Sequence, residues 1–141
     1  MAEFSYAKGR LGDSLRFIAN EIEEFEKEYL ARTLLDYQKD AKIQKLMDRT
    51  VENILTALIE VCGTMLAEKG IAVENYGEVL AKAAEILGLN KDEQSDLAKL
   101  ASQRNRLAHR YLDYKWQAIK MFSEQRGIIK TLLQKVLLAY K

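Results

Sequence analysis

The sequence predicts an all-α protein: an antiparallel bundle of about five helices in one domain that covers residues 1–141. Three observations predict this fold. Apolar residues recur at intervals of three and four along most of the chain, which is the period of an amphipathic helix. No stretch shows the sustained alternation of a strand, and no Asn-Gly or Asp-Gly pair marks a hairpin. The connections between periodic segments are short, so helices adjacent in sequence should pack together.

The first two predicted helices are long. Asp13 or Ser14 is the expected N-cap of the first, because a short side-chain oxygen accepts from an unpaired backbone N–H. Residues 1–10 before it are a candidate N-terminal extension, and residues 36–40 after it are expected to form a loop. The second helix is expected to end at Gly70, since glycine tolerates the left-handed conformation there. Its continuous apolar seam consists of Ile43, Met47, Val51, Ile54, Leu58, Val61 and Met65.

The remaining helices have recognisable starts. Asn75 with Glu78, and Asn90 with Glu93, each resemble a capping box, in which the first side chain and the third helical residue bond each other's backbone. One last long helix is expected to run from about Trp116 to the C-terminus. Gly127 is a weak point within that helix and costs about 1 kcal/mol relative to alanine.

The charge of the chain is unevenly distributed. The net charge is +1, but residues 1–100 carry 13 Lys/Arg and 19 Asp/Glu, a net of −6, whereas residues 101–141 carry 9 and 2, a net of +7. Such a split favours a polyanionic or acidic partner at one end. The alternative is that the basic segment only neutralises the acidic helices of the same fold.

Composition excludes several classes of protein. A single cysteine, Cys62, rules out an intrachain disulfide and a cysteine-cluster zinc site, and is expected in the core. One histidine and one cysteine make a poor metal site, so neither a metal nor another cofactor is expected. The polar Met1–Arg10 segment and the absence of an apolar run of roughly 20 residues predict no signal peptide and no membrane partner. We therefore expect a cytoplasmic protein.

Residues 104–111, Arg-Asn-Arg-Leu-Ala-His-Arg-Tyr, do not fit a plain helical bundle. Arg104 continues the apolar stripe of Leu97, Leu100 and Ala101, and a charge there must be paired or line a cavity. One alternative is purely structural, with Arg104 paired to a buried Glu60. His109 would point about 140° away from Arg104 on an unbroken helix. The two side chains can meet on one substrate if the helix breaks near residue 108, or if a second copy supplies one of them.

Arginine and histidine together suffice for metal-independent RNA cleavage. Histidine exchanges protons near neutral pH, so His109 would activate the ribose 2′-hydroxyl. The guanidinium of Arg104 matches phosphate oxygens and would stabilise the phosphorane. The expected products are a 2′,3′-cyclic phosphate and a 5′-hydroxyl. Arg106, Arg110 and Lys115 are candidate RNA phosphate contacts, with a merely solvated helix face as the alternative.

The spacing of Arg104, His109 and Tyr111 resembles the Arg-x4-His-x-Tyr motif of HEPN-domain proteins, specifically the HepT-like toxins of bacterial and archaeal toxin–antitoxin pairs. The resemblance covers about residues 11–140. Asn105 fits the polar residue that commonly follows the arginine of the family, and residues 51–60 resemble the family's long second helix.

This resemblance implies a HEPN-like homodimer, with two motifs facing each other across a cleft at the interface. It implies a ribonuclease in which Arg104 and His109 are catalytic and Asn105 supports them. It also implies a minimal nucleotidyltransferase antitoxin, which in some pairs transfers AMP to the tyrosine of the motif, here Tyr111. The added negative charge would repel RNA phosphate. The alternative function is a catalytically inactive helical adaptor that binds a nucleotide or a partner protein.

Overall fold

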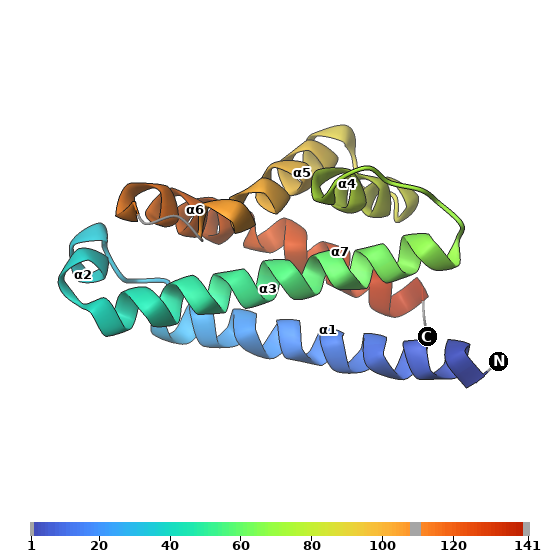
Figure 1. Cartoon of the computed structure of the whole chain (residues 1–141), viewed down its shortest axis with the longest axis horizontal. Coiled ribbons are helices and arrows are strands. Elements are labelled where there is room, and N and C mark those ends of the chain that lie inside the picture. The colour runs from blue at the N-terminus through green and yellow to red at the C-terminus, as the bar shows by residue number, and fades with distance from the viewer. Residues whose placement is uncertain (1, 108–110, 140–141) are drawn as a thin grey trace.

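The computed structural model describes residues 2–107 and 111–139, with side chains from Arg10 onward. It is all-α, as predicted, and the described residues form no strand. Figure 1 shows its seven helices. In chain order they are α1 (Ala2–Glu28), α2 (Leu34–Lys39), α3 (Ala41–Glu68), α4 (Tyr76–Ile86), α5 (Lys91–Arg106), α6 (Leu112–Glu124) and α7 (Arg126–Ala139).

Helix α3 is the centre of the bundle. It packs against α1 along one side, and against α4, α5 and α6 on another (Figure 1). Helices α4 and α5 form the most closely packed pair, and α7 lies against α1. The short connections therefore place sequence neighbours side by side, as expected for an antiparallel bundle.

The apolar seam predicted for the second helix forms the core of the protein. From Met47 to Met65, its members on α3 are almost completely buried, and Cys62 is fully buried among them, as predicted. Each large apolar side chain removed from water contributes about 1.5–3 kcal/mol to folding. By length and composition alone α3 is also long and apolar enough to cross a membrane, contrary to the expectation that the chain has no such apolar segment. Most of its apolar window, 61%, is buried inside the bundle, as in the core helix of a soluble protein.

The predicted helix ends are largely correct. Asn90 Oδ1 accepts from the Glu93 N–H at 2.8 Å, and Glu93 accepts from the Asn90 N–H at 3.0 Å, which completes a capping box. Asn75 likewise accepts from the Glu78 N–H, but the Glu78 carboxylate accepts from the N–H of residue 74 instead. Helix α3 ends just before Gly70, whose φ of 70° is the left-handed conformation expected there.

Two expectations near the N-terminus are wrong. Helix α1 begins at Ala2, so neither Asp13 nor Ser14 is its N-cap; Asp13 instead pairs with Arg16 on the helix surface. Residues 36–40 are not a loop throughout, because α2 covers most of them. Thr33 caps α2 in a capping box with Asp36, and Asp40 then caps α3 by accepting from two backbone N–H groups.

The last predicted helix is two helices, which brings the described total to seven rather than about five. Helix α6 ends at Glu124 and α7 begins at Arg126, so the break at Gln125 lies two residues before the predicted weak point at Gly127. The Gln125 N–H still bonds back to α6, while its φ of −98° and ψ of 9° end the helix. After the break, Arg126 and Lys130 both bond Glu26 on α1, so the change of direction is stabilised by tertiary contacts.

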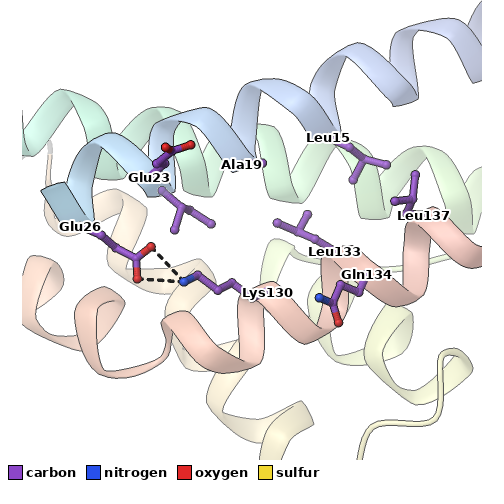
Figure 2. Close-up of a pocket in the computed structure, with 9 residues that line it drawn as sticks. Leu15, Ala19, Glu23, Glu26, Lys130, Leu133, Gln134 and Leu137 are labelled. Atoms are coloured by element: carbon purple, nitrogen blue, oxygen red, sulfur yellow. Dashed lines mark hydrogen bonds and ion pairs between the residues drawn. The ribbon is translucent and has the colours of Figure 1, made fainter.

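An apolar cavity of about 420 Å³ lies between α1 and α7 (Figure 2). Leu15 and Ala19 line it from α1, and Leu133 and Leu137 line it from α7. The Glu26–Lys130 ion pair lies at one end of this cavity. Among the described residues, none of those predicted to act in catalysis or RNA binding lines it.

Candidate functional site

Arg104 lies in the last turn of α5 and is held by two other helices. Its Nε donates to Thr56 Oγ1 on α3 at 2.8 Å. Its guanidinium carbon lies 5.8 Å from the ring centroid of Tyr76, the first residue of α4, in a cation–π contact. The described ion pairs do not join Arg104 to Glu60, the partner suggested by the structural alternative. Thr56, one turn earlier on α3, is the contact that fixes the guanidinium.

The packing of α4 on α5 explains why Tyr76 reaches Arg104. Because these helices are antiparallel neighbours, the start of α4 lies beside the end of α5. A Cβ on Gly77 would lie 3.3 Å from the carbonyl oxygen of Ala98 on α5, which is a tight contact. Glycine at this position therefore allows the backbones to approach closely and brings the preceding ring against the motif arginine.

The helix that carries Arg104 does end before the motif is complete. Helix α5 ends at Arg106, and Tyr111 is the extended N-cap residue of α6, with φ −82° and ψ 119°. The predicted break near residue 108 falls between these two helices, at a position outside the described residues. His109 and Arg110 themselves lie outside the described residues.

Tyr111 is an exposed side chain of the motif. It is 68% exposed, and its ring meets that of Tyr114 edge-to-face at 5.7 Å between centroids. The side chain makes no capping hydrogen bond to α6. The hydroxyl-bearing ring is therefore presented on the surface, where a second protein can reach it.

The other predicted site residues differ in their surroundings. Asn105 is exposed on α5. Arg106 is also exposed, and its Nη1 donates to Gln117 Oε1 on α6 at 3.1 Å, so it bridges the two helices on either side of the motif turn. Lys115 is largely buried and lies 3.5 Å from a carboxylate oxygen of Asp48 on α3. Arg104 and Arg106 thus lie in the last turn of α5 and Tyr111 directly before α6, whereas Lys115 is tied to α3 through Asp48.

A polar network behind α6 was not predicted as a unit. The Tyr37 hydroxyl, from fully buried Tyr37 on α2, donates to Asp48 at 2.6 Å, and Lys115 pairs with the other carboxylate oxygen. The ring of Trp116 packs on Tyr37 with centroids 5.2 Å apart. Burial raises the pKa of Asp48, and burial together with the bond to Asp48 raises the pKa of Tyr37 far above its usual value. The network joins α2, α3 and the first turns of α6.

Gln103 is another residue near the motif that the sequence analysis did not predict to be part of the site. It precedes Arg104 and is buried, and its amide nitrogen donates to the Lys99 carbonyl at 3.2 Å. Its buried Oε1 has no hydrogen-bond partner among the described residues. A buried acceptor normally has a hydrogen-bond partner. The buried face of α5 next to Arg104 therefore carries a polar group among its apolar side chains.

The arrangement suits phosphate chemistry. The guanidinium held by Thr56, the exposed Arg106 and the exposed Tyr111 belong to the end of α5 and the start of α6, in the basic last part of the chain. Within residues 2–107 and 111–139, no three side chains of His, Cys, Asp or Glu come together as metal ligands. Arg104 and Arg106 offer positive charge to an anionic substrate at this end of α5.

A family model described as Ribonuclease HepT-like matches residues 18–132. The chain belongs to the HepT-like ribonuclease family. The match covers most of the chain and includes the whole motif from Arg104 to Tyr111, so the resemblance inferred from that motif is confirmed at the level of the family. No curated protein matches the chain.

Proposed function

We propose that this HepT-like protein is the toxin of a toxin–antitoxin pair and acts in the cytoplasm as a metal-independent endoribonuclease. The observation that carries the proposal is the fixed guanidinium of Arg104 at the head of an Arg-x4-His-x-Tyr motif in a member of a ribonuclease family. A guanidinium already oriented by Thr56 and Tyr76 loses little further freedom when it binds phosphate, which favours transition-state stabilisation.

The proposed reaction is transesterification within RNA. His109 removes the proton of a ribose 2′-hydroxyl, and the 2′-oxygen attacks the adjacent phosphorus. Since Thr56 engages Nε of Arg104, its Nη groups are the donors assigned to the phosphorane oxygens. The bond to the 5′-oxygen breaks, and that oxygen takes up a proton. The products are a 2′,3′-cyclic phosphate and a 5′-hydroxyl, with Asn105 supporting the site.

The proposed active unit is a homodimer, with the two motifs facing each other across a cleft. A two-fold axis beside the motif would bring two copies of Arg104, Arg106 and Arg110 to one cleft. The net +7 of residues 101–141 would then be concentrated there, so a near-neutral protein would attract RNA locally. Arg106 and Arg110 are the residues proposed to contact phosphates beside the scissile one, whereas Lys115, the third candidate, is already paired with Asp48.

Cleavage of RNA in EDTA tests the proposal. Purified parent protein should cut RNA without added metal and leave 2′,3′-cyclic phosphate ends. Arg104→Ala and His109→Ala should each reduce the rate by about 100-fold or more, the usual contribution of a general acid–base or oxyanion-stabilising group. Arg49→Ala removes an exposed arginine of α3 and serves as the matched control, with unchanged activity. If both motif variants are folded and cut as fast as the parent, the assigned site is wrong.

The proposed regulation is AMP transfer by a minimal nucleotidyltransferase antitoxin. The phenol oxygen of Tyr111 would attack the α-phosphorus of ATP, pyrophosphate would leave, and the phenolic proton would pass to a base of the antitoxin or to water. The 68% exposure of Tyr111 supports this assignment, because the attacking oxygen must enter the active site of another protein. The bound nucleotide would add negative charge at the RNA site and block it.

Intact-mass measurement tests this modification. After incubation with the antitoxin and ATP, the parent should gain the mass of AMP, whereas Tyr111→Phe should gain none. Tyr114→Phe removes the neighbouring hydroxyl and is the control that should still be modified. Modification that persists in Tyr111→Phe would refute the site. A parent that is modified but never cuts RNA would instead support the inactive adaptor, the alternative function.

A further inference from the structure

Tyr76 is an exposed aromatic ring that the proposed reaction does not yet use. It is 53% exposed, although it contacts the guanidinium of Arg104 at 5.8 Å. The ring is therefore both in contact with a motif residue and accessible from the surface.

The backbone around Tyr76 keeps the ring in place. Asn75 caps α4 through its bond to the Glu78 N–H at 2.9 Å, so the helix begins at Tyr76 with its first turn anchored. Gly77 lets this turn approach the α5 backbone at Ala98 closely. The position of the ring beside the last turn of α5 is therefore built into two helices and does not depend on a flexible loop.

We propose that Tyr76 is a base-stacking subsite for single-stranded RNA. This inference rests on the proposed function and extends it. Unpaired bases stack on exposed tyrosine rings, and such stacking tolerates many sequences because every base has a flat π-face. The ring and the guanidinium are 5.8 Å apart, so a nucleotide whose phosphate meets Arg104 has a base within reach of Tyr76. The ligand of this subsite is one nucleobase next to the phosphate that Arg104 binds.

A different role for Tyr76 would be to orient Arg104 alone. Thr56 already fixes Nε of that arginine from α3, so the two roles can be separated by substitution. Loss of orientation should slow cleavage whatever the RNA contains. Loss of a stacking platform should weaken binding, and only where the RNA has a base at the stacked position.

The experiment measures binding of the full-length protein to short single-stranded RNA made non-cleavable by 2′-O-methylation. A series of these oligonucleotides lacks the base at one position at a time. For the parent, one abasic position should weaken binding by about 5- to 150-fold, the usual range for one stacked base. Tyr76→Leu should weaken binding to intact RNA by a similar factor, and removal of that same base should then have no further effect.

Control variants distinguish the outcomes. Tyr76→Phe and Tyr76→Trp keep a ring and should bind as the parent does, whereas Thr56→Val should slow cleavage and preserve the dependence on the base. The subsite is refuted if Tyr76→Leu binds RNA as tightly as the parent. It is also refuted if, at every position, removing the base weakens binding by the same factor in Tyr76→Leu as in the parent. In either case the ribonuclease proposal stands. If the parent neither binds nor cleaves RNA, both proposals are refuted.

Discussion

Two carboxylates tie the last third of the chain to the rest of the protein, and they do so in opposite environments. Asp48, with a side chain 14% exposed, joins α3 to α6 through Lys115 and also accepts from Tyr37. Glu26, 31% exposed, joins α1 to α7 through Lys130 and Arg126. Burial raises the pKa of Asp48, whereas the hydrogen bond from Lys130 and the nearby positive charges lower that of Glu26.

The difference shows which physical effect dominates in each region. At Asp48 the loss of hydration outweighs the pairing with Lys115, so the folded environment disfavours the charge. At Glu26 the carboxylate keeps part of its hydration, and pairing dominates. The network of Tyr37, Asp48 and Lys115 therefore orients the first turns of α6, next to the motif, and adds little net stability to the fold. The ion pairs of Glu26 with Arg126 and Lys130 add modest stability to the contact between α1 and α7, which is otherwise made by aliphatic side chains.

Asp48→Ala is expected to have the larger effect on stability. It leaves the Tyr37 hydroxyl buried without its acceptor and Lys115 without its partner. A buried donor left unpaired costs about 1–3 kcal/mol of unfolding free energy. Urea unfolding followed by circular dichroism would measure the loss. Tyr37→Phe removes the donor instead, which leaves no unpaired hydroxyl, and should cost less.

A double-mutant cycle checks this explanation. In the Tyr37→Phe background the hydroxyl is already gone, so Asp48→Ala should destabilise the protein by clearly less than it does in the parent. Equal losses in both backgrounds would contradict a network and would assign the effect of Asp48 to helix packing alone.

The sequence predicted those parts of the fold that depend on local pattern. The period of the apolar residues identified α3 and its buried face, and Asn90 with Glu93 identified the start of α5. Helix α2 was missed because six residues are too few to show a period. The break at Gln125 was not predicted, although Gly127 was marked as a weak point, because the contact that stabilises it joins Arg126 to Glu26, 100 residues away in the chain.

For the candidate site, the sequence predicted the position of Arg104 but not the residues that hold it. Arg104 was placed correctly on the inner side of its helix, where it contacts α3. The angle between Arg104 and His109 left open a helix break, a second copy or both, and residues 108–110 lie outside the described part of the chain. Thr56 and Tyr76, which hold Arg104, were not identified, because nothing in their local sequence reports a contact across 48 residues or between two helix ends. Such partners depend on the packing of helices and become visible with the tertiary structure.

Glu26→Gln should have the smaller effect and sharpens the comparison through pH. Partly exposed ion pairs contribute about 0.2–1 kcal/mol each, so a loss of this order in unfolding free energy is expected near neutral pH. Because the folded pKa of Glu26 lies below its ordinary value of 4.5, its contribution is present above that pH and is lost as the pH falls through the folded pKa. The parent and Glu26→Gln should therefore converge in acid.

The opposite carboxylate supplies the control for this prediction. The folded pKa of Asp48 is raised, so the folded protein binds its proton more tightly than the unfolded chain, and its ionisation costs stability as the pH rises from 3.8 through the folded pKa. Asp48→Asn should remove that cost, so the stability difference between parent and variant should change with pH in the sense opposite to Glu26→Gln. Unfolding free energies of the three proteins from pH 3 to 7 would test this. Parallel curves for both variants would show that neither carboxylate has the environment described above.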